Sequence, residues 1–324
     1  MVKCSLCQDK AIVKIPYAGL RLCKEHFTKY IEDRVRKTIK RYNLISSGMR
    51  VLVAVSGGKD SSTMLVILNK LSKELKFTLY AMHIDLGIGN YSVYSRRTVE
   101  KLSQSLNIPL IILEVKKILG YGIPEIASKA KRPACSVCGV IKRYLINATA
   151  LELGADVVAM GHNLDDIITY AFKEFMNQNL NALAKLGPST KSIKDLAVSR
   201  IRPLYEIYER ESLLYALINN ITFVKDECPM AREDSLDRII KVKYFEIEER
   251  YPGIKLAFVR RFAKNIQYYQ GTEPEFKKCK TCGLLSSWDI CSYCRLSFKI
   301  LGKYMGHDTR NYIRELLKNI LIRT

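Results

Sequence analysis

The middle of the chain alternates short apolar runs with longer amphipathic stretches. Residues 51–55 (VLVAV) form a wholly apolar, valine-rich run, which is typical of a parallel strand buried on both faces. Similar runs predict further strands, and the stretches between them have the apolar spacing of helices. The expected strands are 51–55, 78–85, 110–115 and 156–160, and the expected helices are 61–75, 92–106 and 139–153. This alternation indicates an α/β fold with a doubly wound parallel sheet.

The regions on either side follow other patterns. Residues 27–42 (FTKYIEDRVRKTIKRY) combine apolar residues at helical spacing with many lysines and arginines. They predict an exposed basic helix whose polar face contacts solvent or RNA. Residues from about 164 to 250 are expected to be mainly helical, with KDECPMA as an interruption. A short amphipathic helix is expected at 309–322.

Composition and charge narrow the class of protein. The chain has 324 residues, with 53 lysines and arginines against 32 acidic residues, a net charge of +21. Its 48% hydrophobic content excludes a disordered chain. No apolar run approaches the roughly 18–20 residues that span a bilayer, and the start (MVKCSLCQDK) lacks a signal-peptide core. We therefore expect a soluble cytoplasmic protein, without a membrane partner, whose charge favours nucleic acid or nucleotide ligands or simply solubilises its surface.

The ten cysteines fall into three groups that each contain a C-x2-C pair. The N-terminal group has the form C-x2-C-x15-C-x2-H, and the C-terminal group has the form C-x2-C-x8-C-x2-C. Four thiolate or imidazole ligands at such spacing are typical of structural zinc, whereas a disulfide framework requires an oxidising compartment. The sequence therefore predicts two zinc knuckles, formed by Cys4, Cys7, Cys23 and His26 and by Cys279, Cys282, Cys291 and Cys294.

The central group contains only three cysteines. Cys135 and Cys138 lie in KRPACSVCGVIKRY, a run that leads into the expected helix carrying Lys142, and Cys228 lies in DECPMAR. Three thiolates without an obvious fourth ligand suit a [4Fe–4S] cluster with one open iron. A redox dithiol with Cys228 as a bystander, or zinc with an unidentified fourth ligand, remains an alternative.

A glycine-rich segment, SGGKDS at 56–61, directly follows the first expected strand. Two glycines let the backbone turn sharply, and the following helix directs its free N–H groups and partial positive charge to the same place. Lys59 adds a full positive charge. The segment predicts a phosphate site, although it is not a Walker A loop because G-x4-G-K-[ST] is absent.

This segment resembles the phosphate loop of the PP-loop ATP pyrophosphatases, which cleave ATP between the α- and β-phosphates. Two further polar clusters support the resemblance: HID at 83–85 ends the second strand, and GHNLDD at 161–166 follows the fourth. In open α/β sheets, ligands bind beyond the carboxyl ends of the strands. The alternative interpretations are a hydrogen-bonded core residue at His83 and a helix cap at Asp165.

Taken together, SGGKDS, the cysteine trio, GHNLDD and the two knuckles closely resemble the tRNA 2-thiouridine synthetases of the TtuA/Ncs6 family, from Cys4 to about Cys294. The resemblance implies ATP-dependent replacement of a uridine C2 oxygen by sulfur, in a homodimer that binds zinc, Mg²⁺ and a [4Fe–4S] cluster. It implies that ATP is held by Ala54, Ser56, Gly57, Gly58, Lys59, Asp60, Ser61, Ile84, Lys142, Gly161 and Asp166. It further implies cluster ligation by Cys135, Cys138 and Cys228, and catalytic charges on Asp60, Lys142 and Asp166.

The expected segments are a zinc knuckle at 1–28, a PP-loop catalytic domain at 29–250, a second knuckle at 275–298 and a helical tail at 299–324. The partners implied are tRNA and a sulfur donor, either sulfide or a ubiquitin-like thiocarboxylate carrier. The competing functions are persulfide transfer by the cysteine trio, a 2-thiocytidine or lysidine synthetase of the same superfamily, and a zinc-ribbon protein that only binds RNA.

Overall fold

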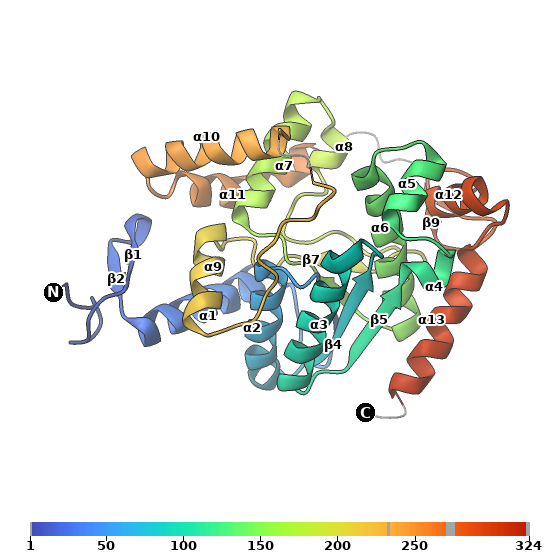
Figure 1. Ribbon diagram of the computed structural model, residues 1–324. Coiled ribbons are helices and arrows are strands. Elements are labelled where there is room, and N and C mark those ends of the chain that lie inside the picture. The colour runs from blue at the N-terminus through green and yellow to red at the C-terminus, as the bar shows by residue number, and fades with distance from the viewer. Residues whose placement is uncertain (1, 232–233, 270–275, 322–324) are drawn as a thin grey trace.

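The structure, a computed structural model, describes residues 2–231, 234–269 and 276–321 (Figure 1). Its centre is a five-stranded parallel sheet with the strand order β5-β4-β3-β6-β7. The strands are β3 (Arg50–Ala54), β4 (Thr78–Asp85), β5 (Leu110–Glu114), β6 (Val157–Ala159) and β7 (Ser199–Ile201). Because β3 lies in the middle and the strand order reverses beside it, the loop after β3 opens at a topological switch point. The doubly wound sheet is confirmed.

Helices cover both faces of the sheet. Alternate residues of β3 divide between them, since Val51 and Val53 pack into one apolar cluster and Leu52 into the other. The first face is covered by α1 (Lys24–Arg41), α2 (Lys59–Leu75), α3 (Gly89–Ser105) and α9 (Glu209–Ile218). The second is covered by α4 (Val115–Leu119), α5 (Ile123–Ala130), α6 (Ala134–Leu153), α12 (Ser292–Leu301) and α13 (Gly306–Leu321). Residue Ile322 of the expected tail helix lies outside the described residues.

A further group of helices lies above the sheet in Figure 1. It consists of α7 (Leu164–Met176), α8 (Leu180–Leu183), α10 (Leu236–Arg250), α11 (Ile254–Asn265) and the 3-10 helix Ile266–Tyr269. These helices have small apolar clusters of their own, built around Leu164, Ile168 and Val259 in one case and Phe262 in the other. No helix in the described part of the chain is long and apolar enough to cross a membrane.

Most helix starts differ from the predictions by two or three residues, and α4 and α5 were not predicted, but the two differences that bear on the site are a strand and the start of α6. Residues 164–250 are not only helical and loop, because β7 adds an edge strand beside β6. Its three residues, SRI, contain no apolar run, since an edge strand buries only part of its surface. Helix α6 begins at Ala134 rather than near Gly139, with Pro133 as its N-cap residue, so Cys135 and Cys138 lie within the helix.

The basic helix is less exposed than its composition predicted. In α1, Phe27, Ile31 and Val35 are fully buried against the sheet face. Arg34, one of its basic residues, is also buried and forms an ion pair with Glu211 of α9 at 2.6 Å. Only the remaining basic residues, such as Lys37 and Lys40, face solvent.

The two ends of the chain form small cysteine-rich units on opposite sides of the molecule (Figure 1). The N-terminal unit contains β1 (Val13–Ile15), a 3-10 helix (Pro16–Ala18) and β2 (Leu20–Leu22), and leads into α1. The C-terminal unit contains β8 (Lys277–Lys278) and β9 (Leu285–Ser286) and leads into α12. The rings of Tyr293 in this unit and Tyr144 in α6 stack with centroids 3.8 Å apart, so the unit packs directly on α6.

Candidate functional site

The glycine-rich segment forms a tight loop between β3 and the N-terminus of α2. Gly57 has a φ of +89°, a left-handed conformation that favours glycine, and a Cβ there would lie 3.1 Å from the Ser95 carbonyl oxygen. Gly58 is the N-cap residue of the seventeen-residue helix α2. The loop therefore directs backbone N–H groups and the positive end of α2 into one space, as an anion site requires.

Lys59 and Asp60 belong to a network of alternating charges beside this loop. The Lys59 Nζ lies 2.9 Å from Asp60 and 2.7 Å from Glu209, and the Lys241 Nζ lies 3.0 Å from Glu209 and 2.8 Å from Asp166. Burial opposes the charge of Lys241, but Asp166 and Glu209 outweigh it and raise the pKa of its ammonium group. Three carboxylates therefore face two lysines in this arrangement, which leaves one negative charge in excess.

Asp60 is the member of the network with an unmatched polar atom. Burial raises the pKa of its carboxyl group despite the opposing effect of Lys59. Its Oδ1 atom is buried and has no hydrogen-bond partner in the described part of the chain. A buried carboxylate oxygen without a partner is destabilising in isolation and is suited to a cation.

The segment after β6 closes the same site. A Cβ on Gly161 would lie 3.1 Å from the backbone nitrogen of Ser61, so this strand end packs against the phosphate loop. Asn163 and Asp166 form a reciprocal capping box at the start of α7. Asp165 accepts a hydrogen bond from the Glu209 backbone nitrogen at 2.7 Å, which caps α9. The interpretation of Asp165 as the cap of the next helix is therefore wrong, because Asn163 caps α7, whereas Asp165 caps α9 and pairs with Lys255. Asp166 both closes the capping box and pairs with Lys241.

Of the two histidines at the strand ends, His83 is buried and His162 is half-buried. His83 Nδ1 lies 2.9 Å from the Val55 carbonyl oxygen, as expected for a hydrogen-bonded core residue. Burial lowers the pKa of His162 to about 4, so its ring is neutral near pH 7. Ala54 and Ile84, at the ends of β3 and β4, are half-buried at the same edge.

The cysteine trio lies at this carboxyl edge of the sheet. Cys135 and Cys138 are three residues apart at the start of α6, so their thiols share one side of the helix. Lys142 follows one turn later; burial raises the pKa of the Cys138 thiol, and Lys142 partly offsets this shift. The Cys135 thiol contacts the Met230 carbonyl oxygen at 3.6 Å, which places the Cys228 segment beside α6.

A backbone hydrogen bond connects the trio to the phosphate loop. The Val224 nitrogen donates to the Gly57 carbonyl oxygen at 2.9 Å, four residues before Cys228. Tyr91, at the start of α3, is close enough to Cys228 and Cys138 for both thiols to raise its pKa, after the larger effect of burial. The segment carrying Cys228 is therefore tied to the glycine turn, and Lys142 lies on α6 close to the Cys138 thiol.

The donor set of the trio fits an iron–sulfur cluster. Among the described residues, only the two terminal groups bring three or more ligand atoms within 4.8 Å of one another, so the three thiols of the trio are spaced more widely than the ligands of a mononuclear metal site. Three cysteine thiols that are free of disulfides match cluster ligation with one open iron better than closed structural zinc.

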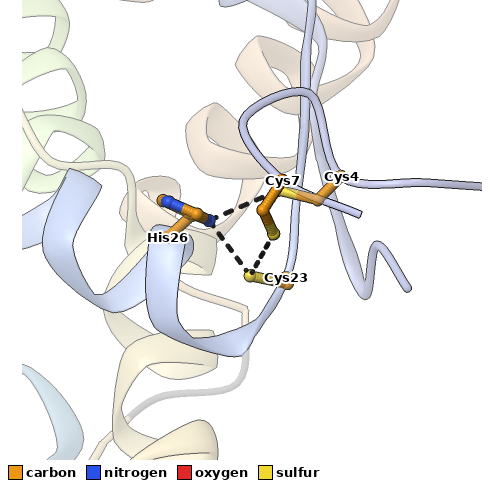
Figure 2. Close-up of side chains that lie close together, drawn as sticks. All are labelled: Cys4, Cys7, Cys23 and His26. Atoms are coloured by element: carbon orange, nitrogen blue, oxygen red, sulfur yellow. Dashed lines mark hydrogen bonds between the residues drawn. The ribbon is translucent and has the colours of Figure 1, made fainter. Parts of the chain in front are cut away.

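The terminal groups have the compactness of mononuclear metal sites. Figure 2 shows the thiols of Cys4, Cys7 and Cys23 turned toward the His26 ring, with His26 Nδ1 3.3 Å from Cys23 Sγ. In the C-terminal group, Cys282 and Cys291 have sulfur atoms 3.8 Å apart, and hydrogen bonding to Cys282 raises the pKa of Cys291 to about 12. Thiols this crowded ionise together only when a cation is bound, which suits zinc.

Sequence reasoning missed two members of the charge network. Glu209 and Lys241 lie 43 and 75 residues beyond Asp166 and belong to no recognisable motif. The acidic residue at the start of α9 was the only local signal, and it is equally typical of an ordinary helix N-terminus.

Comparison with known proteins agrees with this geometry. Residues 27–239 match the family model described as the PP-loop domain, and residues 3–28 match that of the 2-thiouridine synthetase TtuA N-terminal LIM domain. The chain is 41% identical to the tRNA-5-methyluridine(54) 2-sulfurtransferase of Pyrococcus horikoshii, over 91% of this chain and 93% of that protein. It is 36% identical to the Thermus thermophilus protein of the same name, over 90% of each.

A solved structure resembles the whole molecule. The U34-tRNA thiolase NcsA from Methanococcus maripaludis, with its [4Fe-4S] cluster, superposes with a TM-score of 0.78 at 31% identity, covering 93% of this chain and 97% of that one. The chain belongs to the PP-loop family and, within it, to the tRNA 2-sulfurtransferases that include the TtuA 2-thiouridine synthetases. This membership favours the thiolation prediction over the lysidine, 2-thiocytidine and RNA-binding alternatives.

Proposed function

We propose that this enzyme replaces the C2 oxygen of the uridine at tRNA position 54 with sulfur. The observation that carries the proposal is the shared edge: the segment carrying Cys228 is tied to the phosphate loop, and Lys142 lies close to the Cys138 thiol. Position 54 is chosen because the relatives at 41% and 36% identity are named for it. Position 34 is the second candidate, since the structural neighbour is a U34-tRNA thiolase.

The first step uses the phosphate loop. The uridine O2 attacks the α-phosphate of ATP, an O–P bond forms, the α–β bond breaks and pyrophosphate leaves. The backbone N–H groups of Ser56–Ser61 and the N-terminus of α2 stabilise the negative charge that develops on the phosphates. Lys59 would exchange its contacts with Asp60 and Glu209 for phosphate oxygens. Asp60 and Asp166 would then be free to hold Mg²⁺.

The second step replaces the activated oxygen. A sulfide sulfur adds to C2, the C2–O bond breaks, AMP leaves with the former uridine oxygen, and the sulfur loses its proton to solvent. Cys135, Cys138 and Cys228 would hold a [4Fe–4S] cluster, whose open iron supplies a site that can bind sulfide. Lys142, close to the Cys138 thiol, would steady the negative charge on the base.

The remaining parts of the chain would support this chemistry. The described part of the C-terminal knuckle and helices α12 and α13 pack on α6, the helix that carries two of the cluster thiols, and would fix its position within the domain at 29–250. The knuckle at 1–28 would extend the basic surface for tRNA. Zinc in both knuckles and free thiols throughout suit a reducing cytoplasm.

The decisive experiment is nucleoside mass spectrometry of tRNA after incubation with anaerobic protein, ATP and sulfide. We expect 2-thiolated uridine at position 54, with one pyrophosphate released per modified base. A tRNA altered only at position 54 and another altered only at position 34 separate the two candidates. An iron-free, colourless protein with full activity would exclude the cluster and support persulfide transfer by the same cysteines.

A further inference from the structure

Three arginines and a histidine lie beside β6 and β7, and the arginines have no carboxylate partner among the described residues. Arg143 lies on α6 directly after Lys142, Arg200 lies in β7, Arg202 follows β7, and His162 follows β6. Among the described residues, none of the three arginines has an acidic group within ion-pair distance, although most other basic side chains of the interior do. We refer to Arg143, Arg200 and Arg202 as the arginine cluster.

The buried member of the cluster is fixed in place and incompletely satisfied. Arg202 is only 8% exposed, and its guanidinium donates to the carbonyl oxygens of Gly187 and Lys185, the latter at 2.9 Å. Its Nε atom is buried without a hydrogen-bond partner. Burial and the positive charge of Arg200 lower the pKa of Arg202 to about 10, which means that its positive charge is uncompensated. Leaving such a charge unpaired is costly unless an anion arrives.

The other two arginines bring the cluster to the surface. The Arg200 guanidinium reaches the Arg143 carbonyl oxygen at 3.5 Å, and the charge of Arg143, after burial, further lowers the pKa of Arg200. The Arg143 guanidinium folds back over Gly139, where a Cβ would lie 3.0 Å from its Nη1 atom. Gly139 directly follows Cys138, so Arg143 is directed toward the cysteine trio. Arg143 is exposed and Arg200 is half-buried, so a ligand can reach both.

The cluster adjoins the nucleotide site but is separate from it. Gly161 packs on Ser61 of the phosphate loop, and the next residue, His162, faces the arginines, with Arg202 and Arg200 both depressing its pKa after burial. The phosphates of ATP already have the loop and the N-terminus of α2 on the β3 side. If the arginines on the β7 side bind a second phosphate-sized anion, that anion would therefore belong to another molecule.

We propose that the arginine cluster binds a backbone phosphodiester of the RNA strand next to the uridine that reacts. Guanidinium groups suit phosphate because they present paired N–H donors in a plane. Holding the adjacent phosphate would fix the reacting nucleotide between Lys142 and the phosphate loop. The inference rests on the proposed tRNA substrate and adds the residues that position it.

The test compares tRNA binding by anaerobic wild-type protein with that of Arg143→Gln and Arg200→Gln. We expect each variant to bind tRNA about 3- to 10-fold more weakly and to lose roughly one unit from the slope of log affinity against log salt. Arg50→Gln is the matched control, since Arg50 also reaches a carbonyl oxygen of α6, that of Leu153, but lies at the opposite edge of the sheet. Its tRNA affinity should stay within about twofold of wild type.

Two further arms separate the possible sources of the anion. A non-hydrolysable ATP analogue should bind both variants as it binds the wild type; weakened analogue binding with unchanged tRNA binding would assign the cluster to ATP and overturn the proposal. Replacing the phosphate beside the target uridine with a neutral methylphosphonate should weaken tRNA binding by the wild type but should not further weaken tRNA binding by Arg200→Gln. If the losses from the two changes add, the proposal is also overturned.

Failure of this inference is distinguishable from failure of the proposed function. If wild-type protein does not thiolate tRNA, the function itself is wrong. If it does, and both arginine variants keep wild-type affinity and salt dependence, only the phosphodiester site is wrong. Melting temperatures of all variants show whether each one is folded.

Discussion

At the scale of single residues, the site contains charged groups whose burial destabilises the folded protein, and neighbouring side chains that hold these groups in position. Asp60 is half-buried, carries a buried oxygen without a hydrogen-bond partner among the described residues, and is held beside Lys59 rather than fully neutralised by it. Such strain is typical of functional sites, where a charge is kept for the ligand and not for stability. Two substitutions at this scale separate function from folding.

Asp60→Asn should stabilise the free protein while removing activity. Burial raises the pKa of Asp60 in the folded state, so its ionisation opposes folding at pH 7. The variant should melt higher than wild type at pH 7, and the difference should shrink as the pH falls and the wild-type carboxyl group becomes protonated. Pyrophosphate release should fall at least 100-fold.

The control for this variant is Asp289→Asn. Asp289 is exposed, and its hydrogen bond with Lys280 lowers its pKa, so the same chemical change should leave stability slightly lower rather than higher. Calorimetry at several pH values measures both. A lower melting temperature for Asp60→Asn at pH 7 would contradict the assignment of Asp60 as a destabilising charge.

Gly161→Ala should displace the phosphate loop. The new Cβ would lie 3.1 Å from the Ser61 nitrogen and Cα, both backbone atoms that have little room to move. A shift of the loop by a few tenths of an ångström should raise the KM for ATP roughly tenfold. Gly187→Ala is the control, because its Cβ would meet the Ile266 side chain at an ordinary 3.5 Å. Equal KM values for the two variants would refute the close-packing argument.

At the scale of elements, buried ion pairs join helices that are distant in sequence. Arg34 of α1 pairs with Glu211 of α9, and the same carboxylate accepts a hydrogen bond from the Tyr208 nitrogen at the start of α9. The pair therefore fixes α9, which begins at Glu209, a member of the charge network. Helix α9, which is far from the phosphate loop in sequence, is thus held where its first residue, Glu209, contacts Lys59.

Arg34→Met should destabilise the protein strongly. It leaves the Glu211 carboxylate buried without its cation, for which we expect a loss of about 3–5 kcal/mol in the free energy of unfolding. Arg36 of the same helix pairs with Asp33 and Glu74 in a more exposed position, so Arg36→Met should cost less than about 1 kcal/mol. Denaturant titrations of both variants test this; similar losses would show that burial does not decide the effect.

The two terminal cysteine groups, once loaded with zinc, should lose the metal in a fixed order. Cys7 and His26 of the N-terminal group are half-buried, whereas all four cysteines of the C-terminal group are buried. A chelator should therefore remove the N-terminal ion first, followed by alkylation of Cys4, Cys7 and Cys23. Mass spectrometry of alkylated peptides over time measures this order. Earlier alkylation of Cys279 and Cys294 would contradict it.

At the scale of the whole molecule, charge and exposed apolar surface determine which partners the protein binds. Helix α10 carries Ile239, Val242 and Phe245 at 55%, 51% and 45% exposure, at intervals of three residues on one side. Contiguous exposed apolar surface of this kind commonly marks an interface between subunits. The homodimer implied by the family resemblance has a candidate contact here.

Ile239→Glu combined with Phe245→Glu should convert a dimer into a monomer without unfolding it, because these side chains make little contact within the chain. Light scattering after size-exclusion chromatography measures the mass. Glu248→Gln is unsuitable as a control since Glu248 caps α11, whereas Lys243→Glu on the polar side of α10 changes charge alone. A dimer that persists in the double variant would place the contact elsewhere.

The sequence alone determined the local features of this protein: the alternation of strands and helices, the phosphate loop after an apolar strand, and the three groups of cysteines. Each depends on residues near one another in the chain, such as SGGKDS or a C-x2-C pair. The chemistry of these features can therefore be predicted from residue spacing and residue type.

The tertiary structure decided which distant residues meet. Glu209 and Lys241 join the phosphate loop, Arg34 is buried rather than exposed, and Arg143 and Arg200 approach each other from α6 and β7. None of these contacts has a local pattern, because a charged residue in a helix looks the same whether it faces water or a partner. Only the packing of elements fixes its burial and its neighbours, and with them its charge state and role.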